Sequence, residues 1–150
     1  MLQRIQSIYL LGIALCMAVP FFLPIFGIDI VSGNVDYYLF GKEAGLGFIP
    51  KALQYSLLIL VAGTLFLALV TVFCYKNRNL QVKLCFLNIA FIVLFYLGIV
   101  YFKIIADQNQ AGFRLQIAAF LPAVALIFNY LAVRFIKKDE ALIKSMDRLR

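Results

Sequence analysis

The chain has 150 residues, of which 65% are hydrophobic and 14% charged, and its formal net charge is +7. A soluble domain is roughly 45–50% apolar and about 25% charged, so we expect lipid to cover much of this chain's apolar surface. Histidine is absent, which excludes a His-ligated haem, His metal ligands and a His-based catalytic triad.

Four stretches contain no Asp, Glu, Lys or Arg, namely 5–28, 52–75, 84–102 and 115–133. A membrane-spanning helix needs about 20 apolar residues, because each residue rises about 1.5 Å through a hydrocarbon core of about 30 Å. We therefore predict an all-α membrane protein with four transmembrane helices in one up-down bundle. The single domain covers 1–150, with spans at about 5–26, 52–74, 84–105 and 115–136.

The first stretch follows a short basic segment, as a signal peptide does, but its apolar run is long and no small-x-small cleavage site follows it. We expect an uncleaved first helix. Pro20 and Pro24 are expected to bend or end this helix, and Pro122 to kink the fourth one near its outer half.

The external loop, residues 27–50, is the largest segment between spans. Residues 28–31 alternate apolar and polar, Ser32-Gly-Asn34 is typical of a turn, and residues 35–40 are β-branched and aromatic. This pattern predicts a short β-hairpin. Tyr37, Tyr38 and Phe40 are expected at the headgroup level. The other two loops are too short to form a domain.

Asn88 lies five residues into the third charge-free stretch, and Asn129 lies five residues from the end of the fourth. In antiparallel helices this spacing places both amides at the same depth, where we predict that they approach one another directly or through one water. Such bonds contribute about 0.6–2 kcal/mol in membranes. Small residues four apart, such as Ala119 and Ala123, indicate close helix packing, either within the bundle or against a partner helix.

Motifs for catalysis, metal binding or cofactor binding are sparse. The four charge-free stretches lack the Asp, Glu, Lys and Arg residues that proton relays and ion pathways require, and no glycine-rich nucleotide loop or nucleophile elbow appears. Cys16, Cys74 and Cys85 form no Cys-x-x-Cys pair. We predict a non-enzymatic protein without metal or cofactor and with free thiols; acylation of Cys74 stays open.

The distribution of Lys and Arg sets the predicted orientation. Ten of these basic residues lie near the two termini or in the loop between the second and third spans. Four lie on the other side, namely Lys42, Lys51, Lys103 and Arg114. Both termini are therefore expected in the cytoplasm. The basic residues are dispersed over three juxtamembrane segments, which disfavours nucleic acid and favours anionic lipid headgroups as their partner.

The cytoplasmic tail, residues 137–150, has helical periodicity. Leu142, Met146 and Leu149 fall on one helical face. No Gly or Pro separates the tail from the fourth span, so the helix is expected to continue. The stripe suits either the bilayer surface or a protein partner, and Arg148 and Arg150 are the candidates for pairing with a partner's carboxylates.

The opening Met1-Leu-Gln-Arg-Ile-Gln-Ser-Ile-Tyr-Leu10, the four spans and the closing Lys138-Asp-Glu-Ala-Leu-Ile-Lys-Ser-Met-Asp-Arg-Leu-Arg150 resemble a bacterial family of small four-span inner-membrane proteins. That family is catalogued only as a domain of unknown function. The resemblance implies a multi-pass protein of the cytoplasmic membrane of a Gram-negative bacterium. It implies no activity, cofactor or catalytic residue.

These features favour a non-catalytic accessory or scaffold subunit of a larger inner-membrane complex, with integral membrane proteins of unknown identity as partners. Two alternatives stay open. A small oligomeric transporter or channel predicts a water-filled cavity at the depth of Asn88 and Asn129. A membrane-embedded lipid enzyme predicts a lateral groove with polar groups around Tyr9, Tyr55, Tyr96 or Tyr130.

Overall fold

The computed structural model describes residues 2–30, 33–40, 51–74 and 77–147. In these ranges the chain is mostly helical, with one small sheet. The elements in chain order are α1 (Leu2–Ala18), η1 (Val19–Phe21), β1 (Phe26–Ile30), β2 (Gly33–Tyr37), α2 (Lys51–Phe73), α3 (Arg78–Gln108), β3 (Gly112–Leu115), η2 (Ile117–Phe120) and α4 (Leu121–Asp147), where η denotes a 3₁₀ helix.

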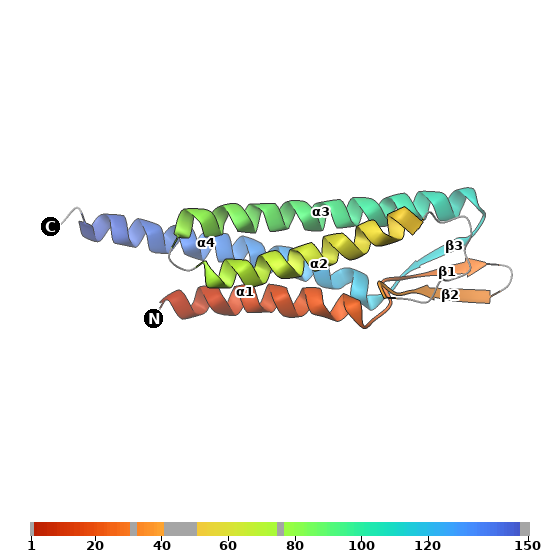
Figure 1. Ribbon diagram of the computed structural model, residues 1–150, viewed down its shortest axis with the longest axis horizontal. Helices are drawn as coiled ribbons and strands as arrows, with labels where there is room; N and C mark the ends of the chain where they lie inside the picture. Colours follow the sequence, from red (N-terminus) through yellow and green to blue (C-terminus); the bar gives the residue numbers. More distant parts are fainter. Residues whose placement is uncertain (1, 31–32, 41–50, 75–76, 148–150) are drawn as a thin grey trace.

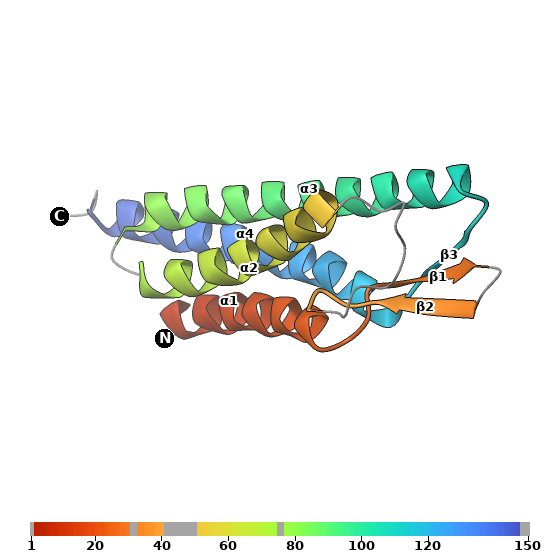
Figure 2. The ribbon, with the colours of Figure 1, turned by 45° about the vertical axis from the view of Figure 1, so that its right-hand side comes forward.

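The four α-helices lie side by side along the long axis of the molecule (Figure 1). Each packs against the next in sequence, and α1 also packs against α4. Both termini lie at one end of the helices and the sheet lies at the other, as the rotated view also shows (Figure 2). We call these the terminal end and the sheet end. Successive helices therefore run in opposite directions, as the sequence predicts.

Three helical segments in the described part of the chain are long and apolar enough to cross a membrane: Ala52–Phe73, Arg78–Gln108 and Ile117–Asp139. Their outward surfaces carry large apolar side chains, among them Ile59 and Phe66 on α2 and Leu97 on α3. The molecule is thus a membrane protein with an apolar exterior. Within α1 and η1, the apolar helix Ser7–Phe21 is shorter than those three, so the fourth span stays a prediction.

Prolines determine where two of the helical segments begin and end. The predicted first span, 5–26, runs past the end of α1, through η1, to the first residue of β1. The α-helix is shorter than this span because it ends at Ala18, and Pro20 lies in the 3₁₀ helix that follows. The expected end of the first helix at this proline is confirmed. The expected kink at Pro122 is wrong: this proline is the second residue of α4, where its missing N–H costs no helical hydrogen bond.

The sheet has the strand order β2-β1-β3, and both pairings are antiparallel. β1 and β2 form the predicted hairpin, with Ile30 opposite Gly33 and Asp29 opposite Asn34. Two residues of the predicted turn Ser32-Gly-Asn34 are therefore paired residues of β2. Gly33 has a φ of +137°, a conformation that residues with a side chain rarely adopt. The glycine that indicated the turn is therefore the first residue of β2.

The third strand, β3, comes from the loop between α3 and α4, which the sequence analysis considered too short to contribute to a domain. Leu115 of β3 lies opposite Phe26 of β1, and Phe113 lies opposite Ile28. The predicted fourth span, 115–136, therefore begins at the last residue of a strand, and the long apolar segment begins at Ile117. Residues from the two loops at the sheet end therefore form one sheet.

Aromatic rings join the apolar face of this sheet to α3. Phe26 stacks on Tyr37 with ring centroids 4.5 Å apart, and lies 5.0 Å from Phe102 and 5.3 Å from Phe113. Phe26, Tyr37 and Phe102 are buried. Tyr38 and Phe40 are exposed, whereas Tyr37 is buried, because residues 35 and 37 share the face of the strand that covers the helices. The position of the three rings at the headgroup level stays a prediction.

Candidate functional site

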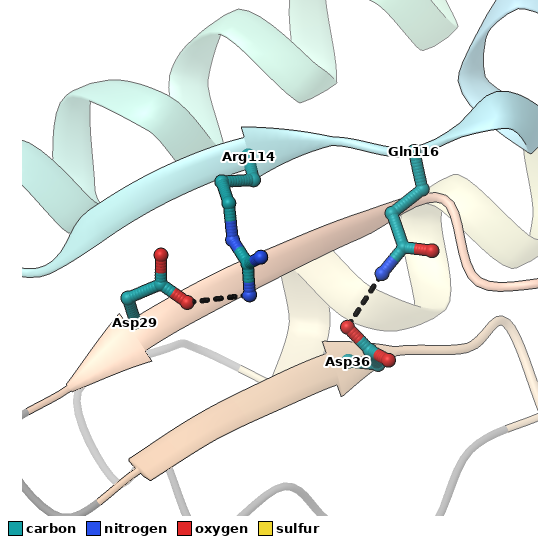
Figure 3. A network of polar contacts seen from close by, with 4 residues as sticks. All are labelled: Asp29, Asp36, Arg114 and Gln116. Atoms are coloured by element: carbon teal, nitrogen blue, oxygen red, sulfur yellow. Dashed lines mark hydrogen bonds and ion pairs between the residues drawn. The ribbon is translucent and has the colours of Figure 1, made fainter.

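The opposite face of the sheet carries a cluster of polar side chains, Asp29, Asp36, Arg114 and Gln116 (Figure 3). The Arg114 guanidinium donates from Nη2 to Asp29 Oδ1 over 2.7 Å, and Gln116 Nε2 donates to Asp36 Oδ1. In the amide orientation that satisfies its neighbours, Asn34 donates to Asp29 Oδ1 over 3.1 Å and accepts from Arg114 Nη2 over 3.2 Å, and so joins the first pair. All three strands therefore contribute to one polar network.

Gly27 lies at the centre of this polar face. It is paired with Asp36 on one side and with Arg114 on the other. A Cβ atom at this position would lie 3.1 Å from Asp36 Oδ1, 3.6 Å from Gln116 Nε2 and 3.8 Å from Arg114 Nη2. The absence of a side chain at Gly27 lets the polar groups of β2 and β3 reach across β1.

The chemistry of this network is that of a solvated structural contact. The side chains of Arg114 and Asp29 are 54% and 37% exposed, and exposed ion pairs contribute about 0–1 kcal/mol. In the described part of the chain, no group of three or more Cys, Asp or Glu residues could hold a metal ion. The network thus fastens the third strand to the hairpin and presents a polar surface at the sheet end.

Inside the helical part, Asn88 and Asn129 are both buried, with 1% and 0% of their surface exposed. Asn129 donates its side-chain N–H to the backbone oxygen of Ala125, one turn earlier on α4. Among the described residues, neither amide oxygen has a hydrogen-bond partner, so no direct hydrogen bond links the two amides. Their role in helix packing, directly or through a water, stays a prediction.

Two side-chain hydrogen bonds connect neighbouring helical segments. Near the terminal end, Gln81 Nε2 donates to the backbone oxygen of Thr71 over 3.1 Å, linking α3 to α2. Toward the sheet end, the Tyr96 hydroxyl donates to the backbone oxygen of Ala119 over 2.8 Å, linking α3 to η2. Gln81 was not among the residues that the sequence singled out.

The three cysteines, Cys16, Cys74 and Cys85, are free thiols. Cys85 is buried on α3, and the other two are partly exposed. Cys74 directly follows α2 at the terminal end, and its acylation stays an open prediction.

The predicted helical continuation of the tail is confirmed as far as Asp147, because α4 is one uninterrupted helix from Leu121. It extends beyond the other helices at the terminal end (Figure 1). Leu142 and Met146 lie on this extension, although their side chains are outside the described part of the chain. Arg148, Leu149 and Arg150 lie wholly outside the described residues.

From the sequence, Arg114 was expected only as a juxtamembrane charge, and Gln116 was not predicted to have a role. The signal for both is the alternation Gly112-Phe-Arg-Leu-Gln116, in which Phe113 and Leu115 share one strand face and Arg114 and Gln116 share the other. The same alternation in residues 28–31 was recognised as a strand. A second alternating run on the same predicted side of the membrane could have been paired with the first.

Comparison with known proteins gives a family but no activity. No curated protein and no solved structure matches the chain. The resemblance carried by the two terminal patterns and the four apolar segments is nevertheless confirmed: a family model described as a domain of unknown function (DUF4293) matches residues 2–149, so the chain belongs to this family.

Proposed function

We propose that the protein is a four-span inner-membrane protein, with both termini in the cytoplasm, that acts as a non-catalytic accessory or scaffold subunit of a larger membrane complex. The observation that carries this proposal is the extension of α4, a continuous helix of 27 residues that projects past the other helices (Figure 1). A helix that leaves the packed group of helices retains a face for another protein.

The length of α1 together with η1 supports the fourth span. The 17 residues of α1 rise about 26 Å at 1.5 Å per residue, and the three residues of η1 add about 6 Å at 2.0 Å per residue. The combined length of about 32 Å is close to the hydrocarbon thickness of about 30 Å. α1 also packs against both α2 and α4, which places it among helices of spanning length.

The charges support the orientation. The described basic side chains at the terminal end are Arg78, Lys83, Arg134, Lys137 and Lys138, and the one described carboxylate there is the buried Asp139. The sheet end carries Lys103 and Arg114 together with Asp29, Asp36 and Asp107. Basic flanking residues favour the cytoplasmic side of the membrane, so the sheet faces the outside.

Mild-detergent purification from native membranes tests the scaffold role. We expect membrane-protein partners to co-purify in fixed stoichiometry, and a variant truncated after Glu140 to insert normally but lose them. A full-length protein that purifies as a partner-free monomer contradicts the proposal.

Point variants localise the contact within the tail. The double change Leu142→Glu and Met146→Glu places two charges on the apolar stripe and should abolish co-purification. Lys144→Gln, which changes the opposite helical face by its spacing, serves as the control and should retain the partners. Equal retention by both variants would assign the stripe to the bilayer surface.

A small oligomeric transporter is the second candidate. The amide oxygens of Asn88 and Asn129, which have no hydrogen-bond partner among the described residues, favour it, because such buried polar groups require an explanation such as water. Cysteine substitution at each position and labelling with a small water-soluble reagent tests it. Reaction at both positions in intact membranes supports a hydrated path, whereas complete protection contradicts it.

A further inference from the structure

The terminal end carries a basic patch at the seam between α3 and α4. Lys83 on α3 and Arg134 and Lys137 on α4 are all exposed. The described carboxylate nearest in sequence, Asp139, is buried, so no described acidic side chain is exposed beside them. The surface has the charge that an anionic group requires.

One contact fixes the position of this patch across the two helices. The Lys137 Nζ atom lies 5.8 Å from the centre of the Phe86 ring, within the range of a cation–π interaction. Lys83 precedes Phe86 by three residues on α3, and Arg134 precedes Lys137 by three residues on α4, so each pair shares one helical face. Lys137 therefore lies against an aromatic ring that is 54% exposed, with Lys83 about one helical turn from Phe86 on α3 and Arg134 about one turn from Lys137 on α4.

The seam continues from this patch toward the sheet end as an apolar surface. Val93 lies two turns beyond Phe86 on α3, and Tyr130 lies two turns before Lys137 on α4. Both side chains are exposed, Tyr130 to 64%. A cationic patch at the terminal end, continued toward the sheet end by an exposed apolar surface, is complementary to an amphipathic molecule with an anionic headgroup and an acyl chain.

We propose that Lys83, Arg134 and Lys137 bind the phosphate headgroup of an anionic phospholipid, whose acyl chain lies along Phe86, Val93 and Tyr130. Arg134 follows directly after the charge-free segment 115–133, which places the three cations at the headgroup level. Basic pockets between transmembrane helices on the cytoplasmic side are a known physical solution for holding such headgroups. This site would bind lipid whether or not the protein is a scaffold.

The test measures binding of phosphatidylglycerol and phosphatidylcholine to the purified full-length chain by native mass spectrometry. The wild-type chain should retain phosphatidylglycerol in preference to phosphatidylcholine. The variant Lys83→Gln with Lys137→Gln should bind phosphatidylglycerol about 30-fold more weakly, because each basic side chain near an anionic surface contributes about fivefold.

The matched control is Lys103→Gln with Lys138→Gln, which removes the same number of charges from the same two helices outside the patch. The control should bind phosphatidylglycerol as the wild-type chain does. An equal loss in both variants would reduce the effect to net charge and overturn the site. A wild-type chain that shows no preference between the two lipids would overturn the proposed lipid site. If the variant with Lys83→Gln and Lys137→Gln then also loses a co-purifying protein, the patch binds a protein instead.

Discussion

At the sheet end, two loops far apart in sequence are fastened together by backbone pairing, a buried aromatic cluster and an exposed ion pair. At the terminal end, one described side-chain hydrogen bond, from Gln81 to the Thr71 backbone, joins α3 to α2, and α4 continues alone past the other helices. The two ends also differ in charge: most of the described carboxylates lie at the sheet end, and most of the described basic side chains lie at the terminal end.

This difference indicates different tasks for the two ends. At the sheet end, the described polar side chains of Asp29, Asp36, Arg114 and Gln116 pair with one another, and the strands pack against α3 through aromatic rings. The terminal end leaves its cations and the α4 extension available to lipid or to another protein. We therefore place stability at the sheet end and interaction at the terminal end.

The largest expected effect comes from Phe102→Ala, which removes the α3 ring on which Phe26 and Tyr37 pack. Loss of a buried phenyl group costs about 3–5 kcal/mol, so the sheet should detach from the helices and become accessible to protease. The control Phe66→Ala, on the exposed face of α2, should leave proteolysis unchanged. Equal resistance of both variants would show that the sheet is held by other contacts.

A smaller effect is expected from the Tyr37 hydroxyl, which is buried and has no hydrogen-bond partner among the described residues. Burial raises the pKa of Tyr37, so the stability of the sheet is independent of pH through this group below the unfolded pKa of about 10 and falls as the pH rises above that value. Tyr37→Phe removes this dependence, and at neutral pH it should be neutral or stabilise by about 1 kcal/mol. Protease resistance of the sheet, followed from pH 7 upward in both chains, measures the difference; parallel curves would exclude Tyr37 as its cause.

The smallest effect is expected from the ion pair on the exposed face. Arg114→Gln should destabilise the sheet by at most about 1 kcal/mol, since both side chains are partly solvated. The effect should vanish at high salt, where exposed charges are screened. A double-mutant cycle with Asp29→Asn measures the coupling, and a coupling that persists at high salt would contradict a purely surface contact.

Features that depend on residues close together in the sequence could be predicted, and contacts between residues far apart in the sequence could not. The charge-free runs predicted the apolar helices, and the alternation together with the turn signal predicted the hairpin, because both are local patterns. β3 was missed because its four residues pair with β1, and Arg114 meets Asp29 from 85 residues away. The depths of Asn88 and Asn129 could be estimated by counting along the predicted helices, but the side-chain rotamers, which decide the hydrogen bonds, could not.

Accessibility labelling across the membrane tests the central claim most directly. In a chain with its native cysteines replaced, single cysteines at Gln3, Asn34 and Lys138 are treated with a membrane-impermeant maleimide in spheroplasts. The account predicts that Asn34→Cys reacts at once, and that Gln3→Cys and Lys138→Cys react only after permeabilisation. Immediate reaction of Gln3→Cys alongside Asn34→Cys would show that α1 does not cross, and immediate reaction of Lys138→Cys with protection of Asn34→Cys would reverse the orientation.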